Sequence, residues 1–406
     1  MDKPPFVLEP IPPENYPDYR YEVIFKAYKW DPQVRDTNTV SRHVILMAPE
    51  TASELGALAE HLSDEIMGME DALIARPDLY RALGFSGKIK KPLGAMGEYR
   101  RDKNVRLMRF DFHPTDKGWR ISEVNSDVPG GLAEASVLPA IVGKYFHNIK
   151  PGENVASHIL RSFQAKLEKG GRVAFVHATS YADDRQVMQF LADYFGQNGF
   201  RTFFAAPDHI RWNNKKAYSI LSGEEGAVDG IVRFFPLEWF STLPHKSNWS
   251  GYFSCDTPCC NHPAAMLTQS KRLPLVWDNL GMDIPYWKAL LPETKEPGDI
   301  SKKQEGWIYK PAFGRVGGGI SIKGAIPEKE RLKIEKSARR QRRLWVAQQM
   351  FNSIPVKSPG GEQYHACIGV FTVDGKAAGL YARLSETARI DENAQDVPVL
   401  IQGNEE

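Results

Sequence analysis

Two carboxylates and an amide lie close together in sequence, at Asp111, Glu123 and Asn125. Carboxylate and amide oxygens are the hard ligands that Mg²⁺ prefers, and three of them leave coordination positions for water and phosphate oxygens. Such a site would hold its metal ion beside a bound nucleotide. The alternative is a surface hairpin in which Arg109 pairs with the acidic side chains and no metal binds.

A lysine and a glycine-rich segment lie together much later in the chain. Lys310 precedes the segment Phe313-Gly-Arg-Val-Gly-Gly-Gly319. Glycines let backbone N–H groups approach phosphate oxygens, and a lysine adds a positive charge. No Gly-Lys-Ser or Gly-Lys-Thr leads into a helix, so this is not a Walker loop, and no helix follows that would complete a dinucleotide-binding fingerprint. The segment indicates either phosphate binding or the flexible tip of a hairpin.

A cysteine cluster has a chemical and an ordinary interpretation. Cys255, Cys259, Cys260 and His262 are metal-ligand types, but adjacent cysteines chelate poorly and the second half of a zinc site is missing. Catalysis by one of these thiols would need a base that the sequence does not identify. Loop or partly buried thiols are the favoured interpretation.

The segment from Lys329 to Arg343 is rich in lysine and arginine. A solvated helix face explains it more simply than nucleic-acid binding, which would need interleaved aromatic residues or a known module. We therefore expect no nucleic-acid partner.

An amphipathic helix is predicted from Thr51 onward. Thr51-Ala-Ser-Glu54 matches a capping box, in which the two side chains bind free backbone N–H groups. Apolar residues follow at helical spacing as far as Met69. The pattern therefore predicts an amphipathic helix of roughly five to six turns.

The first candidate site lies on a predicted β-hairpin, whose strands and turn are Val105–Phe112, Trp119–Asn125 and Pro114–Gly118. Because side chains alternate across a strand, Arg109 and Asp111 share one face of the first strand. Ile121, Glu123 and Asn125 likewise share one face of the second. An antiparallel register that buries the phenylalanines between them brings the polar side chains together on the other side.

The middle of the chain alternates strand, helix and strand, with predicted elements at Arg172–Val176, Asp183–Phe195, Arg201–Ala205 and Gly230–Phe235. This spacing is typical of a βαβ unit, whose ligand crevice lies beyond the carboxyl ends of its parallel strands. Asp183 and Asp184 fall at that edge.

The last third is predicted to be mostly antiparallel sheet, with strands at Trp307–Pro311, Ile320–Lys323, Leu344–Gln349, His365–Val373 and Ala377–Arg383. Asp374-Gly375 joins the last two strands and is a strong signal for a type I′ hairpin turn.

Composition bounds the class of protein. The 406 residues carry 52 Lys and Arg against 50 Asp and Glu, a net charge of +2, so no overall field draws the chain to nucleic acid or to a membrane. No apolar run is long enough to span a bilayer, and the start has no signal-peptide pattern. Four cysteines do not make a disulfide scaffold. We expect a soluble cytoplasmic protein without a membrane partner.

A set of motifs occurs along the chain in this order: Arg109-Phe-Asp111, Glu123-Val-Asn125-Ser-Asp127-Val-Pro129, Ser270-Lys271, Lys310-Pro-Ala-Phe-Gly-Arg-Val-Gly317, Val346-Ala-Gln-Gln349 and Ala378-Gly-Leu-Tyr-Ala-Arg383. The set resembles the glutathionylspermidine synthase family over roughly residues 15 to 402. The resemblance implies an α/β chain with an ATP-grasp fold, in which two α+β lobes enclose ATP, and a βαβ pre-ATP-grasp subdomain. The metal-binding motif precedes the lysines, which is the circularly permuted order of this family.

The resemblance also implies roles for individual residues. It implies metal binding by Asp111, Glu123 and Asn125, ATP binding by Lys271, Lys310, Gly317, Gln349 and Met350, catalysis by Arg109 and Arg383, and substrate binding by Arg109, Asp183 and Asp184. ATP and Mg²⁺ are the implied co-substrate and cofactor. Only the synthetase is implied, because an amidase domain needs an early nucleophilic cysteine and the first cysteine is Cys255.

The implied activity is ATP-dependent ligation of a carboxylate to an amine through an acyl phosphate, acting on a small peptide or amino acid. The alternative is a non-catalytic ATP-binding protein with the same fold. We expect an N-terminal strap and edge elements at 1–50, a helix and metal-binding hairpin at 51–150, a βαβ substrate-binding subdomain at 151–265 and an ATP-binding lobe at 266–406. The acid, the amine and the oligomeric state are left open, with a homodimer as the candidate assembly.

Overall fold

The computed structural model describes residues 3–97, 99–301, 304–314 and 317–403. Its centre is a six-stranded antiparallel sheet in the order β21-β20-β19-β5-β6, with β18 pairing to β19. The strands are β5 (Leu107–Thr115), β6 (Gly118–Asn125), β18 (Val356–Lys357), β19 (Gln363–Val373), β20 (Lys376–Ser385) and β21 (Gln395–Val397). The predicted hairpin is confirmed, although its strands extend further and leave a turn of only Asp116 and Lys117. The predicted turn at Asp374-Gly375 is confirmed too, with both φ angles positive.

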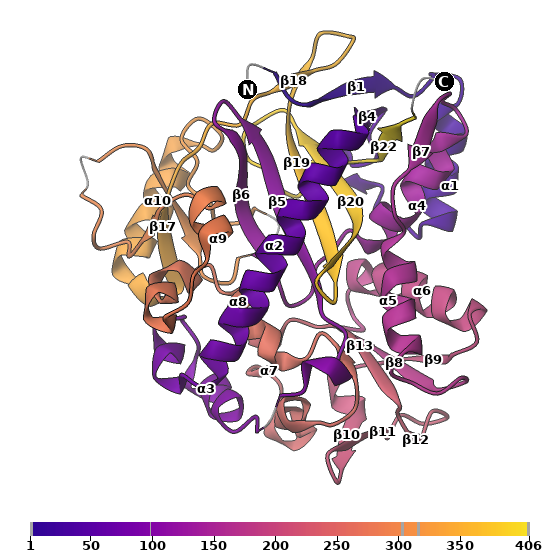
Figure 1. Cartoon of the computed structure of the whole chain (residues 1–406), viewed down its shortest axis with the longest axis vertical. Helices are drawn as coiled ribbons and strands as arrows, with labels where there is room; N and C mark the ends of the chain where they lie inside the picture. The colour runs from indigo at the N-terminus through magenta and orange to yellow at the C-terminus, as the bar shows by residue number, and fades with distance from the viewer. Residues whose placement is uncertain (1–2, 98, 302–303, 315–316, 404–406) are drawn as a thin grey trace.

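Helix α2 (Pro49–Ile74) lies across one face of this sheet, as Figure 1 shows. Its apolar stripe, including Leu62 and Ile66, shares one buried core with Phe110 and Phe112 of β5. The predicted capping box is wrong, because the helix begins two residues earlier, at Pro49, and has no side-chain cap. Proline is well suited to the first helical position, where its missing N–H costs nothing.

A parallel sheet in the order β14-β13-β8-β9 forms the second unit. Its elements are β8 (Arg172–His177), α6 (Ala182–Gln197), β9 (Arg201–Ala205), β13 (Gly230–Phe234) and β14 (Cys259–Cys260). The predicted βαβ unit is thus confirmed. Aromatic rings of α5 (Val155–Gln164), α6 and β8 pack edge to face within its core.

A third sheet, in the order β15-β17-β16, is covered by a basic helix. The elements are β15 (Thr294–Lys295), β16 (Trp307–Pro311), β17 (Trp345–Gln349) and α10 (Glu328–Arg340). The predicted strand at Ile320–Lys323 is wrong, since only an isolated bridge from Lys323 is found. Ser321 still contacts β16: its N–H donates to the Tyr309 carbonyl over 3.2 Å, while its hydroxyl, rather than a backbone carbonyl, accepts the Tyr309 N–H over 2.7 Å.

The two ends of the chain meet in a fourth sheet, in the order β1-β4-β22-β7. Its strands are β1 (Phe6–Pro10), β4 (His43–Met47), β7 (Ile149–Pro151) and β22 (Val399–Gln402), and helices α1 (Tyr16–Lys26) and α4 (Leu132–Gly143) pack beside it (Figure 1). Parallel pairing of β22 with β4 ties the C-terminal strands to the start of α2.

The remaining elements are short: β2 (Gln33–Val34), β3 (Thr37–Asn38), α3 (Gly87–Gly94), β10 (Ile210–Asn213), β11 (Lys216–Ser219), β12 (Gly226–Ala227), α7 (Leu237–Phe240), α8 (Met266–Gln269) and α9 (Pro285–Leu290). Among the helices that the structure describes, none combines the length and the apolarity needed to cross a membrane.

Candidate functional site

The face of the central sheet opposite α2 carries the polar residues. Cross-strand partners share a face, so the register alone places them together. The partners are Arg109 with Asn125, Asp111 with Glu123, Gly369 with both Asp111 and Tyr381, Cys367 with Arg383, and Arg383 with Asp396. The predicted meeting of Arg109, Asp111, Glu123 and Asn125 on one face is confirmed.

Ile121 does not lie on this face as the sequence predicted. It pairs with Phe112, and both side chains are buried in the core beneath α2. The register shifts at this point, so that Ser122 has no partner and forms a bulge in β6. The extra residue reverses the alternation. Because of the bulge, one short strand presents Ile121 to the core and Glu123 to the polar face.

Arg109 and Asp111 form a two-point ion pair. The guanidinium Nε and Nη2 of Arg109 lie 2.7 and 3.0 Å from the two carboxylate oxygens of Asp111. The amide of Asn125 donates to one of these oxygens over 3.0 Å, and Arg109 also donates to the Gly130 carbonyl. Charge-assisted pairs of this kind hold both partners in one geometry. The predicted phosphate-facing arginine is therefore fixed beside two predicted metal ligands.

Both predicted ATP-binding lysines reach the same face. Lys271 Nζ lies 2.6 Å from the Glu123 carboxylate and donates to the Gly314 carbonyl over 2.8 Å. Lys310, which is buried, donates to the Ser122 carbonyl over 3.1 Å. Burial lowers the pKa of Lys310 to about 8 despite the attraction of Glu123. Burial raises the pKa of Glu123, but the charges of Lys271 and Lys310 outweigh it and hold that pKa below its ordinary value.

The glycine-rich segment lies against the C-terminal part of the chain. Arg315 and Val316 are outside the described residues. Gly317 has a φ of +63°, and a Cβ there would lie 2.3 Å from the Ile390 carbonyl oxygen, so only glycine fits. Arg389 Nε also donates to the Gly317 carbonyl over 3.0 Å. Gly317 is thus held against Arg389 and Ile390.

A small cleft lies among β6, residues 268–274, α9 and β17. Its lining includes Glu123, Lys271 and the buried Gln348. The predicted adenine neighbours, Gln349 and Met350, follow directly and have exposed side chains. Their backbone N–H groups are already bonded, to the carbonyls of residues 293 and 306. Gln348, which the sequence did not single out, is therefore the side chain placed in the cleft.

Arg109 also rests on Tyr381, with its guanidinium carbon 5.1 Å from the ring centre. Two glycines make this packing feasible. A Cβ at Gly131, where φ is +84°, would lie 2.9 Å from the Tyr381 ring, and one at Gly369 would lie 2.8 Å from Arg109. Tyr381 could have been found from its spacing of two residues from Arg383 on the same strand face.

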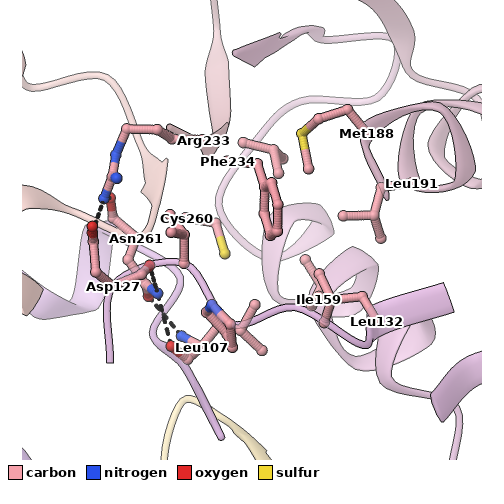
Figure 2. Close-up of a pocket in the computed structure, with 13 residues that line it drawn as sticks. Leu107, Asp127, Leu132, Ile159, Met188, Leu191, Arg233, Phe234, Cys260 and Asn261 are labelled. Atoms are coloured by element: carbon pink, nitrogen blue, oxygen red, sulfur yellow. Dashed lines mark hydrogen bonds and ion pairs between the residues drawn. The ribbon is translucent and has the colours of Figure 1, made fainter. Parts of the chain in front are cut away.

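The loop that follows Asn125 is held by buried polar groups from elsewhere in the chain. Figure 2 shows Asp127 turned toward Arg233 of β13, with which it forms a buried ion pair, and Asn261 turned toward Leu107. The Asn261 amide donates to the Leu107 and Asp127 carbonyls over 2.7 Å each. Gln269 Oε1 accepts the backbone N–H of Asp127. The parallel-sheet unit thus fixes the loop that carries Gly130.

The predicted substrate-binding pair, Asp183 and Asp184, lies on the first turn of α6 rather than on the polar face. Burial raises the pKa of Asp183, and the nearby charge of Asp31 adds to this rise while Lys29 opposes it. Lys29 in turn lies 2.8 Å from Asp396, next to Arg383 in the sheet. A line of charged groups therefore connects the start of α6 with the polar face.

The donors at the predicted metal position fit a cation that binds together with a nucleotide. Two carboxylates and an amide supply fewer oxygens than octahedral Mg²⁺ needs, so phosphate and water oxygens would complete the shell. Arg109 and Lys271 pair with the carboxylates of Asp111 and Glu123. Within the described ranges, no group of three or more His, Cys, Asp and Glu is arranged to hold a metal on its own.

All four cysteines are buried free thiols. The sulfurs of Cys255 and Cys259 lie 3.7 Å apart, and Cys259 and Cys260 form β14. Burial raises the pKa of Cys260 to about 12, which disfavours the reactive thiolate.

Comparisons with known protein sequences identify a family and one named relative. A model of the glutathionylspermidine synthase preATP-grasp family matches residues 14–402. A Haemophilus influenzae protein that carries the name of an acid–amine ligase is 24% identical over 220 residues, which are 52% of this chain and 54% of that protein. The chain therefore matches about half the length of this relative.

A solved structure extends the comparison to the fold. A glutathione synthetase-like effector from Globodera pallida matches with a TM-score of 0.62 and 11% sequence identity. The match covers 96% of this chain and 97% of the effector. At this identity the likeness establishes the fold, which is of the ATP-grasp type as the sequence predicted.

Proposed function

Because the chain belongs to the glutathionylspermidine synthase family, we propose that it is an ATP- and Mg²⁺-dependent ligase that joins a carboxylate of a small peptide or amino acid to an amine. The proposal rests on one observation above the others. Two lysines, two carboxylates, an amide and an arginine, which come from segments far apart in sequence, converge on one face of the central sheet.

The chemistry proceeds in two displacements. A carboxylate oxygen attacks the γ-phosphorus of ATP, and the bond from that phosphorus to ADP breaks. The amine nitrogen then attacks the acyl carbon, the C–O bond breaks, phosphate leaves with the bonding electrons, and the amine loses a proton. Phosphorylation is needed because a free carboxylate would have to expel oxide.

The residues of the polar face have the charges that this chemistry needs. Lys271 pairs with Glu123, and the phosphate oxygens of ATP would take the place of that carboxylate. Arg109, fixed by Asp111 and Tyr381, supplies a preorganised positive charge for the transferring phosphoryl group. Bound Mg²⁺ would neutralise part of the triphosphate charge, held by Asp111, Glu123 and Asn125.

ADP release by the full chain tests the proposal. Purified protein with ATP and Mg²⁺ is assayed against a panel of amino acids and small peptides, each with and without amines. We expect ADP release to require both an acid and an amine. Glu123→Gln should lower it by at least about a hundredfold, since a ligand and a lysine partner are lost together. Asp116→Asn, in the exposed turn of the same hairpin, is the matched control and should retain full activity.

Two outcomes would count against the proposal. Normal turnover in Glu123→Gln would remove the metal role of that carboxylate. Stabilisation of the protein by Mg²⁺ and ATP without ADP release across the whole panel would favour a nucleotide-binding protein that lacks the reaction.

A further inference from the structure

Lys29 occupies an acidic cluster at the border of the polar face. Its ammonium lies 2.8 Å from Asp396, 3.3 Å from Asp31 and 3.3 Å from Glu134, and its side chain is only 10% exposed. The three carboxylates come from β21, from the segment around Lys29 and from the first turn of α4. One ammonium thus pairs with three partly buried carboxylates. Removing these charges from water costs desolvation free energy.

The segment that carries Lys29 is held in place. The N–H of Lys29 donates to Val23 at the end of α1, and the N–H of Trp30 donates to the Gln186 side chain over 2.9 Å. Gln186, on α6, also donates to Asp31 over 2.8 Å. These hydrogen bonds fix the backbone that carries Lys29, and so they fix the position from which its ammonium reaches the three carboxylates.

Asp396 is the carboxylate that connects this cluster to the polar face. One of its oxygens pairs with Lys29, and the other accepts the hydroxyl of Tyr381 over 2.6 Å. Arg383 is its neighbour in the sheet and forms a loose ion pair with it, in which the Arg383 Nε lies 3.6 Å from the carboxylate and makes no hydrogen bond to it. Both oxygens of Asp396 are therefore already bound, one by Lys29 and the other by Tyr381.

The hydrogen bonds of Arg383 go to neutral groups. Its Nη2 donates to the Asp391 carbonyl over 2.6 Å, with a longer contact to the Ala394 carbonyl. Backbone carbonyls carry no net charge, so they orient the guanidinium through its N–H groups alone. The only charged partner of Arg383 within the described residues is therefore Asp396, in an ion pair of 3.6 Å.

We propose that Lys29 is a positioning residue: by pairing with Asp396 it keeps the loose ion pair between that carboxylate and Arg383 from closing into a hydrogen-bonded one, and so fixes the place of the arginine on the polar face. The catalytic importance of this arrangement rests on the proposed function. The competition between Lys29 and Arg383 for Asp396 does not, since it is a matter of distances within the chain.

The pH response of the cluster depends on all the groups that face Asp396. They are Lys29, Asp31, Glu134, Tyr19, Tyr381 and Arg383. Burial raises the pKa of Glu134. Burial also raises the pKa of Asp396, but Lys29, Arg383 and the Tyr381 hydroxyl together outweigh it and lower that pKa. Without the ammonium, the carboxylates would repel one another and take up protons more readily.

Substitution of Lys29 by methionine tests the proposal, because methionine keeps most of the length and removes the charge. Lys26→Met, three residues earlier and exposed in its ion pair with Glu22, is the matched control. Lys29→Arg restores the charge. Crystal structures are determined for the wild type and all three variants. In Lys29→Met we expect Arg383 to move to hydrogen-bond distance of Asp396, and in the other two variants to stay where it is.

Kinetics of the full chain provide the second readout. For Lys29→Met we expect kcat to fall on the order of tenfold to a hundredfold, with KM for ATP nearly unchanged, because the ATP lysines are untouched. Activity of this variant should recover as pH falls, since protonated Asp396 no longer attracts Arg383. Lys29→Arg should keep most of the wild-type kcat.

The outcomes separate the two proposals. If the wild type ligates no acid to any amine, the proposed function fails, but the Arg383–Asp396 distance still decides the role of Lys29. An unchanged distance in Lys29→Met overturns the inference. If that variant does not fold, Lys29→Met combined with Asp31→Asn and Glu134→Gln removes the excess charge and must show the same movement of Arg383.

Discussion

Lys310 should make ATP binding depend on pH in a defined direction. Burial lowers its pKa from 10.5 to about 8 in the free protein. Phosphate oxygens next to the ammonium would favour its charged form and raise that pKa again. Binding of ATP at mildly alkaline pH should therefore take up a proton.

The expected uptake follows from the fraction of Lys310 that is neutral before binding. With a pKa of about 8, that fraction is about 0.1 at pH 7, about 0.5 at pH 8 and about 0.9 at pH 9. These fractions are the protons taken up per ATP bound if the bound pKa lies well above 9. The apparent Kd should also rise nearly tenfold per pH unit above pH 8.

Isothermal titration calorimetry measures the uptake directly. Titrations of Mg²⁺ and ATP at one pH in buffers of different ionisation enthalpy give the number of protons exchanged. Lys310→Met should abolish the uptake, whereas Lys336→Met, on the exposed face of α10, should leave it unchanged. No uptake in the wild type at pH 8, or equal uptake in Lys310→Met, would refute the assignment of this lysine to the phosphates.

The same group affects folding with the opposite dependence. The unfolded chain holds the proton up to a pKa of about 10.5, while the folded chain releases it at about 8. The cost of burying the ammonium is therefore complete below pH 8 and disappears as pH approaches 10.5, so the contribution of Lys310 to stability becomes less unfavourable as pH rises.

Two further predictions concern the loop after Asn125. Gly131→Ala should lower the free energy of unfolding by about 1–3 kcal/mol, because Gly131 has a φ of +84° and the added Cβ would collide with the Tyr381 ring. Gly143→Ala, where the added Cβ meets open space, is the control and should be nearly neutral. Urea unfolding measures both. Asp127→Asn should cost about 3–5 kcal/mol in the same assay, because it leaves buried Arg233 without its partner. A loss below about 1 kcal/mol in either variant would show that the loop is not held as described.

Local pattern was sufficient for the hairpin that carries the candidate site. Alternation placed Arg109, Asp111, Glu123 and Asn125 on one face, and the register confirms it. Alternation failed for Ile121, because a bulge adds one residue to β6 and turns the Ile121 side chain to the opposite face of the sheet. The residue types here gave no sign of where the bulge would form. Glu123 was placed correctly because it lies beyond the bulge and keeps its spacing from Asn125.

Contacts between segments far apart in the chain could not be predicted from the sequence. Lys29 and Asp396 lie at opposite ends of the chain, and nothing in their neighbourhoods indicates a shared cluster. Gln348 was missed for a related reason. Alternation separates Gln348 from Gln349, but it does not tell which of them faces the cleft until the partner sheet is known.

The site depends on one long-range pairing above all. Each hairpin of the central sheet has its own short turn, at Asp116-Lys117 and at Asp374-Gly375, which fixes the register within that hairpin. The antiparallel pairing of β5 with β19 brings Asp111 and Arg383 onto one face, and a slip of one residue would turn the polar side chains of the slipped hairpin toward the core under α2. The apolar residues beneath α2 therefore set the register on which the candidate chemistry depends.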